Sequence, residues 1–391
     1  MTVIVSIDSS IYQYNGSFFV VNSDLADLPM RYLRVFERVR LVGRVVPINY
    51  LPVKYVQISH PRLEIWAVPY FRGIKQLLFN YISIQKALCN VSQGCDAAVL
   101  RIPSNLGILV WKKVYSAALP YAVEVVYDAC DGYKSCHGFQ RLIWYGIHRK
   151  MQQICFLADG VSCVTQHSLQ QQYYTKKKDG FESYYSSIML PHNFYGAPRR
   201  LMAKNEYIVA HASNPIIYKG RKGHIEVIKA ISIANKNGYN VRVKFAGGGD
   251  NASLESLCAL AKTLGIEDKV EFVGFLSKEE LRQMLLEADL FVMPTRAEGL
   301  PRVIIEAMAV GLPCISTNVS GNSELLQPEF LLDNYSDIQL LSQKIIALLT
   351  DADLYAETSK HNFTISQQYE QLILQKRRDL FYSKLKEISQ A

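Results

Sequence analysis

The sequence predicts an α/β protein built from two doubly wound, Rossmann-like domains that face a cleft. Its 391 residues exceed what one hydrophobic core usually holds, because domains average roughly 150 residues. Hydrophobic residues make up 49% of the chain and charged residues 20%, which is ordinary for a folded globular protein. In the second half, short apolar runs alternate with segments of helical periodicity. That alternation is typical of a parallel sheet covered by helices on both faces.

The elements of the second half follow from this alternation. Ser277 and Glu280 form a capping box at the start of one helix, and Pro301 and Gly311 mark the start and the end of another. We predict helices at 223–236, 252–264 and 278–287 and from 301 onward, and strands at 206–212, 241–247, 269–275, 290–295 and 313–318.

The first half shows the same pattern less clearly, with strands predicted near 3–7, 41–47, 97–102, 122–127 and 161–165. Turn residues and charges gather between 176 and 200, so we place the join between the domains near 193–200. The first domain is then 1–195 and the second 196–364. A long helix pattern fills 365–391 and is expected to pack back toward the first domain.

Positive charge is concentrated in the first half. Residues 1–195 hold 20 Lys and Arg against 12 Asp and Glu, which accounts for the net charge of +8 of the whole chain. The same half holds all three Trp and most of the Tyr residues. This composition favours an anionic partner, such as a membrane surface, and aromatic contacts with sugars. A basic surface that only maintains solubility is an equal alternative.

Arginines recur at positions 31, 34, 38, 40 and 44. They could form a patch for a polyanion, but we predict instead a strand with alternating arginines at a solvated sheet edge.

Several classes of site and location are disfavoured. The eight cysteines form no CxxC pair, and the spacing of Cys130, Cys136 and His137 is poor for zinc, so we expect no metal. No window is apolar enough to span a bilayer, and the start MTVIVSIDSS has no basic region typical of an export signal. We therefore expect a cytoplasmic protein.

The most informative segment is MPTRAEGLPRVIIEAMAVGLPCISTN at 293–318. A strand leads to Glu298, a tight turn follows, and the helix that Pro301 opens carries Glu306. Free N–H groups at the start of a helix favour phosphate or sugar hydroxyls, and a carboxylate can accept two hydrogen bonds from a vicinal diol. The turn contains Gly299 and Leu300, and the helix begins with Pro301 and Arg302. These four residues supply such N–H groups or flank them.

This segment resembles the signature of glycosyltransferase family 4, in which two Glu residues are separated by seven residues in an EGxPxxxxEAMAxGxPxI setting. The resemblance implies the GT-B fold, a nucleotide-sugar donor, and transfer with retention of configuration. It implies that Glu298 positions the donor sugar and Glu306 the ribose, and that the reaction needs no cofactor or metal.

The segment YKGRKGHIEVIKAI at 218–231 resembles the basic stretch that contacts the donor diphosphate in this family. Lys222 and Gly223 match its Lys-Gly pair. The family's preceding Gly-Arg pair is missing, so Lys219 or Arg221 is expected to supply the second cation. Fixed cations and helix N-termini can stabilise a departing diphosphate without a metal ion.

Other matches to the family are shorter. Gly274 and Leu276 end a strand that resembles the segment holding the base. In the first domain, Gly16 stands at the position where the family has a glycine pair. Asp128, with Asp131 nearby, stands at the position where the family often has a His that touches the donor sugar. Asp128 could orient a sugar hydroxyl, although an Asp that caps a loop is an equal alternative.

We therefore expect a retaining hexosyltransferase that uses a nucleotide sugar, with a UDP-sugar favoured. The branch that it resembles implies a glycan or lipid-linked acceptor in capsular, O-antigen or exopolysaccharide synthesis, with peripheral contact at the inner membrane face. A GT-B phosphorylase and a sugar-nucleotide epimerase are alternatives within the fold. A polyanion-binding module is the alternative outside enzymes, although nucleic acid is not an expected partner.

Overall fold

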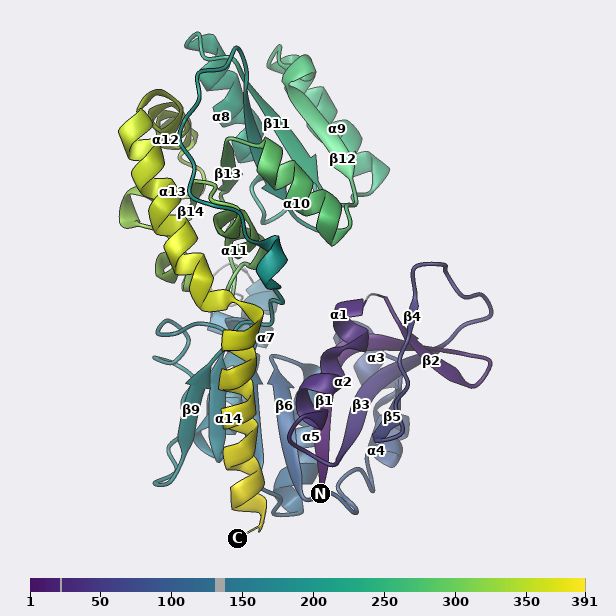
Figure 1. Cartoon of the computed structure of the whole chain (residues 1–391). Coiled ribbons are helices and arrows are strands. Elements are labelled where there is room, and N and C mark those ends of the chain that lie inside the picture. Colours follow the sequence, from purple (N-terminus) through teal and green to yellow (C-terminus); the bar gives the residue numbers. More distant parts are fainter. Residues whose placement is uncertain (22, 131–137, 391) are drawn as a thin grey trace. The chain divides into compact units, whose positions relative to one another are not determined.

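The computed structural model describes residues 1–21, 23–130 and 138–390. The chain divides into two compact units, one made of Met1–Tyr185 with Leu374–Ala391 and the other of Ser186–Ile373 (Figure 1). The division after Tyr185 falls before the join that the sequence suggested near 193–200. Among the described residues, no helix is both long enough and apolar enough to cross a membrane.

The first unit is built on one mainly parallel sheet. Its parallel strands run in the order β5-β3-β1-β6-β7-β8-β9, while β2 and β4 add antiparallel pairs beside β1. The strands are β1 (Thr2–Tyr14), β2 (Ser17–Val20), β3 (Arg38–Pro47), β4 (Val56–Gln57), β5 (Leu63–Pro69), β6 (Ala97–Ile102), β7 (Tyr121–Val125), β8 (Gly160–Cys163) and β9 (Phe181–Tyr184).

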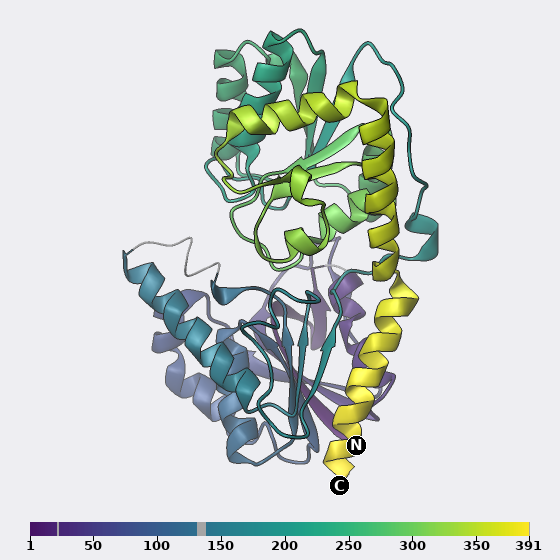
Figure 2. The same ribbon diagram turned by 90° about the vertical axis from the view of Figure 1, so that its left-hand side faces the viewer.

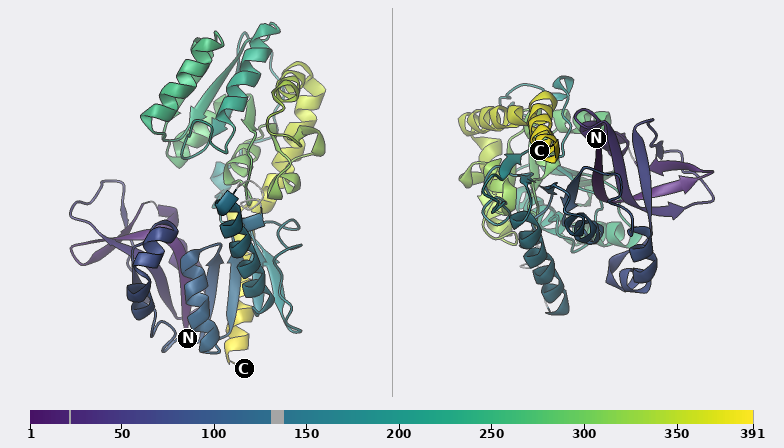
Figure 3. Two further views of the ribbon diagram at one scale, coloured as in Figure 1. Left: turned by 180° about the vertical axis from the view of Figure 1, so that it is seen from behind. Right: turned by 90° about the horizontal axis from the view of Figure 1, so that it is seen from below.

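Helices cover both faces of this sheet (Figures 2 and 3). On one face, the Tyr121 hydroxyl of β7 accepts from Trp111 Nε1 at 3.1 Å and donates to Ile154 O at 2.9 Å, which joins α5 (Asn105–Ser116) and α7 (Gly138–Phe156). The helices α3 (Gly73–Phe79) and α4 (Tyr81–Ala87) lie on the same side (Figure 3).

The opposite face carries α1 (Ser23–Ala26), α2 (Leu28–Leu33) and α14 (Gln371–Gln390). There the buried Glu124 carboxylate accepts from Tyr32 of α2 at 3.1 Å and from Tyr382 of α14, and it pairs with Arg101. These bonds hold the C-terminal helix against the first unit.

The second unit has a six-stranded parallel sheet in the order β12-β11-β10-β13-β14-β15. A shared core joins α8, α9 and α12 to one face, and α10 and α11 contact the sheet from the other. The bounds are β10 (Tyr207–Ala212), α8 (His224–Lys236), β11 (Val241–Ala246), α9 (Asn251–Thr263), β12 (Val270–Gly274), α10 (Lys278–Glu287), β13 (Leu290–Met293), α11 (Arg302–Ala309), β14 (Cys314–Thr317), β15 (Leu331–Leu332), α12 (Ile338–Thr350) and α13 (Ala352–Ser366).

The predicted α/β class, with two Rossmann-like units, is confirmed. The ends of α8, α9, α10 and α11 agree with the sequence to within one or two residues, and Ser277 and Glu280 form the expected capping box. In the second half β15, α12 and α13 were not predicted. In the first half β2, β4, β5 and β9 were not predicted.

Three predictions about local structure were wrong. β1 runs to Tyr14, far beyond residue 7, because its outer part pairs with β2 and, after an irregularity in register, again with β3. The arginine segment is a helix at 28–33 followed by β3, which is no sheet edge because β1 and β5 flank it. The last helix pattern is interrupted by a 3-10 turn at Gln367–Tyr369.

Candidate functional site

The loop that follows β13 brings a carboxylate to the start of α11. Glu298 is buried in this loop, and the buried Thr295 Oγ1 donates to its Oε1 at 3.0 Å. The N-cap residue of α11 is Pro301, whose side chain makes no capping hydrogen bond. The positive end of α11 therefore lies beside the loop of Glu298.

Lys222 supplies a cation to the same place. Its ammonium group forms an ion pair with Glu298 Oε1, and the two side chains are 23% and 12% exposed. The loop of Lys222 is also fixed by its backbone, because Arg296 N donates to Arg221 O at 2.9 Å. An ammonium has three N–H donors, so Lys222 can bind Glu298 and still offer donors to an anion.

Gly223 allows these two loops to approach. It has φ of +77° and serves as the N-cap of α8. A Cβ atom at this position would clash with the carbonyl oxygen of Pro294. Only glycine therefore combines this backbone conformation with this contact.

Two neutral histidines lie beneath Lys222. His211 Nε2 donates to Lys222 O at 2.8 Å, Ser213 Oγ lies 2.9 Å from His224 Nε2, and the ring centroids are 4.6 Å apart. Burial holds the pKa of His211 well below its ordinary value. Burial, and then the charge of Lys222, lowers the pKa of His224 to about 4. Near pH 7 both rings are therefore uncharged, and neither competes with Lys222 as a cation.

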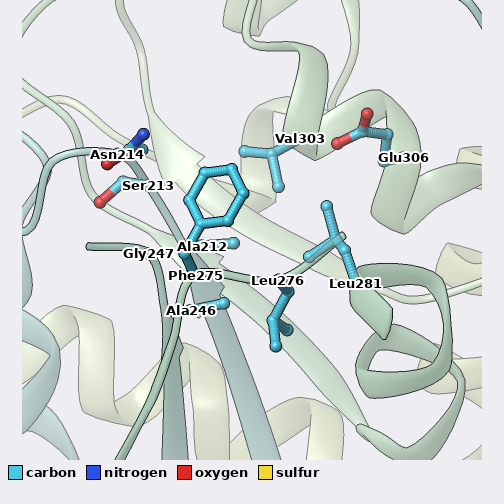
Figure 4. Close-up of a pocket in the computed structure, with 10 residues that line it drawn as sticks. All are labelled: Ala212, Ser213, Asn214, Ala246, Gly247, Phe275, Leu276, Leu281, Val303 and Glu306. Atoms are coloured by element: carbon cyan, nitrogen blue, oxygen red, sulfur yellow. The ribbon is translucent and has the colours of Figure 1, made fainter. Parts of the chain in front are cut away.

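A cavity of about 190 Å³ opens at the carboxyl ends of β10, β11 and β12. Glu306 of α11 lies on one side of it, while Ser213 and Asn214 lie on the other (Figure 4). Apolar side chains form most of the remaining lining: Phe275, Leu276, Leu281 and Val303, together with Ala212, Ala246 and Gly247. An apolar wall with a few polar groups suits a ligand in which a planar ring is joined to a group that carries hydroxyls.

Glycines shape the floor of this cavity. Gly247 has φ of +135°, and a Cβ atom there would clash with Ser213 O. Its N–H donates to Gly274 O at 2.8 Å, which ties the end of β11 to the end of β12. Gly274 has φ of +78° and directly precedes Phe275 and Leu276 of the cavity.

The structure thus brings most of the predicted site residues to one edge of the second unit's sheet. Glu298, Gly299, Leu300 and Pro301 follow β13, and Arg302 and Glu306 lie on α11. Lys219, Arg221, Lys222 and Gly223 share the loop before α8, where Lys219 and Arg221 are exposed. Gly274 ends β12, and Leu276, two residues later, lines the cavity.

Asp128 belongs to the first unit and has local partners. The buried carboxylate oxygen Oδ1 accepts from Cys130 N at 2.8 Å and from the Tyr173 hydroxyl at 3.2 Å. Burial is the largest cause that raises the pKa of Tyr173, and the charge of the Asp128 carboxylate is the next. The His148 ring lies 2.8 Å from the same hydroxyl, so Asp128 is part of a hydrogen-bonded chain.

Gly16 also belongs to the first unit. It and Asn15 form the two-residue turn between β1 and β2, with φ of +79° and +46°. A hairpin turn by itself requires a glycine there. Asp131, Cys136 and His137 lie outside the described residues. In the described part of the chain, no three His, Cys, Asp or Glu side chains gather to hold a metal ion.

Several residues that line the cavity, among them Ser213, Asn214 and Phe275, were not assigned to the site from the sequence. These three lie at the end of a predicted strand or directly after one. Their position at strand ends was the available signal, because ligands in parallel α/β sheets bind at the carboxyl ends.

Residues 209–363 match the family described as glycosyl transferases group 1. The chain is 26% identical to Protein CapJ of Staphylococcus aureus over 307 residues, which cover 77% of this chain and 75% of that protein. It is 38% identical over 114 residues to the amylovoran biosynthesis glycosyltransferase AmsK of Erwinia amylovora, a match that covers 27% of each chain.

The fold resembles that of a solved structure over nearly its whole length. The Anabaena protein Alr3699/HepE, in complex with UDP-glucose, aligns with a TM-score of 0.67 and 16% identity. The alignment covers 98% of this chain and 100% of that protein. At this identity the likeness establishes the shared fold.

Proposed function

We propose that this chain, in which residues 209–363 match the glycosyl transferases group 1 family and which has the GT-B fold, transfers a hexose-type sugar from a UDP-sugar to a glycan or lipid-linked glycan. The proposed transfer retains the anomeric configuration. The complex of HepE with UDP-glucose supports the choice of donor. The likeness to AmsK, named for amylovoran biosynthesis, supports a role in capsular, O-antigen or exopolysaccharide synthesis. We place this reaction at the cytoplasmic face of a membrane, which the basic first unit contacts.

One observation carries the proposal. The pair of Lys222 and Glu298, the start of α11 and the cavity lined by Glu306 all lie at the carboxyl edge of one sheet. In the proposed complex, the base lies between Leu276 and the apolar wall, and Glu306 accepts hydrogen bonds from the ribose diol. The diphosphate meets Lys222 and the N–H groups at the start of α11, and Glu298 positions the sugar.

The proposed chemistry is a substitution at the anomeric carbon. The bond from this carbon to the diphosphate oxygen breaks, and UDP leaves with the electron pair. The acceptor hydroxyl forms the new bond on the same face of the sugar, and its proton passes to the diphosphate oxygen that departs. Lys222 and the helix N-terminus offset the charge that develops on UDP, so the proposal requires no metal ion or other cofactor. We assign Asp128 to the acceptor side, where its carboxylate would orient a hydroxyl.

The first experiment is a thermal-shift screen with UDP, GDP, ADP, CMP and their sugar conjugates, because a ligand that binds only the folded state raises the unfolding midpoint. We expect UDP and UDP-sugars to raise the midpoint of the wild type, and Glu306→Ala to lose this shift. The matched control is Glu329→Ala, which removes an exposed carboxylate elsewhere in the second unit. Equal shifts in Glu306→Ala and the wild type would contradict the role of Glu306.

A transfer assay then tests the reaction itself. The purified protein is incubated with the selected UDP-sugar and a lipid-linked glycan, and the anomeric configuration of the product is read by NMR. The proposal expects the configuration of the donor. An inverted product would exclude retention, and a product that forms only with inorganic phosphate would indicate a phosphorylase.

A further inference from the structure

One face of the first unit's sheet is covered by helices that contain no acidic residue. These helices are α3, α4, α5 and α7, whereas the whole chain has 35 Asp and Glu among its 391 residues. Figure 3 shows the four helices on one side of this sheet, with α14 on the other. The cationic residues on them are Lys75, Lys86, Lys112, Lys113, Arg141, Arg149 and Lys150.

The same helices expose large apolar side chains. Phe79 is 91% exposed, Ile82 is 72% exposed and Leu78 is 68% exposed, all on α3 and α4. On α7 the exposed residues Arg141, Leu142, Tyr145 and Arg149 recur at helical spacing, so cationic and apolar groups share one side of this helix. Folded proteins seldom leave such aliphatic and aromatic groups together in water without a partner.

Three of these helices, α4, α5 and α7, are attached to the first unit through their other sides, whereas α3 has no buried residue. Ile84 and Leu88 of the α4 segment are buried, and Trp111 of α5 bonds the Tyr121 hydroxyl of the sheet. Lys150 of α7 lies 4.5 Å from the centre of the Trp111 ring, so α5 and α7 are neighbours. The outward side chains of α4, α5 and α7 are therefore held against the sheet, and α3 adds Leu78 and Phe79 directly before α4.

We propose that this basic helical face, formed by the outward side chains of α3, α4, α5 and α7, docks on an anionic lipid bilayer. Lysine and arginine would meet the lipid phosphates, while Leu78, Phe79, Ile82 and Leu142 would enter the boundary between headgroups and acyl chains. Charge complementarity favours an anionic partner. The aliphatic side chains favour a bilayer over a nucleic acid, which offers phosphates and base faces but no acyl region. This inference deepens the membrane contact proposed above and rests on it for the type of partner.

The test is co-sedimentation of the full-length protein with two kinds of vesicle. One kind contains phosphatidylcholine alone, and the other contains phosphatidylcholine mixed with phosphatidylglycerol. We expect binding to the anionic vesicles that weakens as salt is added, and little binding to the neutral vesicles. Equal binding to both kinds, or binding to neither, would overturn the proposal.

Variants locate the surface. Lys75→Gln with Lys86→Gln should weaken vesicle binding roughly 25-fold, because each lysine near an anionic surface contributes about fivefold. Lys376→Gln with Lys384→Gln is the matched control on α14, on the other side of the sheet. Leu78→Ser should also weaken binding, whereas Leu380→Ser on α14 should not, although both leucines are 68% exposed. Equal losses on both helices would overturn the assignment of the face.

Two further readouts separate this inference from the donor proposal. The midpoint shift with UDP should be the same in these variants as in the wild type, which also shows that they are folded. Vesicle binding without any UDP shift would contradict the proposed donor and leave the docking face standing. Retention on immobilised DNA with no vesicle binding would assign the face to a different partner and overturn the proposal.

Discussion

The ammonium group of Lys222 forms an ion pair with the carboxylate of Glu298. The pair joins the loop before α8 to the loop after β13, two segments that are separated by 76 positions in the sequence. It lies beside the start of α11, so a cation and the positive end of a helix are close together.

Lys222→Ala should lower kcat about 100-fold to 1,000-fold, as expected when one group that stabilises developing negative charge is removed. The rate of sugar transfer at saturating donor measures this effect. Lys236→Ala, an exposed lysine at the far end of α8, is the control and should keep the wild-type rate. A similar loss in both variants would contradict the assigned role of Lys222.

The two members of the ion pair should act together in a double-mutant cycle. Lys222→Ala combined with Glu298→Ala should reduce kcat/KM little beyond the more severe single variant, because residues in contact are coupled by about 0.5–3 kcal/mol. The four rates are measured with the same donor and acceptor. Strictly additive losses would show that the pair does not act as a unit.

Gly223→Ala should destabilise the protein more than Gly238→Ala. Both glycines have positive φ, so alanine at either position destabilises the folded state by about 1–2 kcal/mol. Only at Gly223 would the new Cβ also clash with Pro294 O, which adds about 1–3 kcal/mol. Urea unfolding compares the two variants, and equal losses would contradict the close contact between the loops.

The buried histidines should make the stability of the second unit depend on pH. The pKa of His224 is lowered to about 4 in the folded state, so the unfolded state binds more protons between pH 4 and the ordinary pKa of 6.5. Stability is therefore present above pH 6.5 and falls as the pH decreases. His224 alone accounts for about 2 kcal/mol between pH 7 and pH 5.

His211, whose pKa is also lowered by burial, adds to this fall in the same direction. Free energies of unfolding from urea titrations at several pH values measure the effect. In His224→Gln the decrease from pH 7 to pH 5 should be smaller than in the wild type. An unchanged decrease would show that His224 is not the group responsible.

The motif around Glu298 was readable from the sequence because its signals are local. The strand, the turn at Gly299, the helix start at Pro301 and the stop at Gly311 all lie within one short segment. The same is true of the capping box at Ser277. Such signals depend on neighbours three or four residues apart, so no distant contact is needed to interpret them.

The first unit was harder to predict because its elements depend on distant partners. The outer part of β1 is a strand only because β2 and β3 pair with it, and the arginines after residue 30 divide between a helix and an inner strand. Asp128 and Gly16 were assigned to the site because of their positions in the family resemblance. In the structure Asp128 accepts a hydrogen bond from Tyr173, and Gly16 lies in the β1–β2 turn.

The sequence by itself therefore determined the fold class, the alternation of strands and helices from β10 to β14, and the candidate residues at the strand ends of the second unit. Only the tertiary structure decided that Lys222 contacts Glu298, that two buried histidines lie below them, and that Ser213 faces Glu306 across a cavity. It also decided that four helices without acidic residues share one face of the first sheet. The physical reason is that periodicity and caps act within a few residues, whereas packing joins segments far apart in the chain.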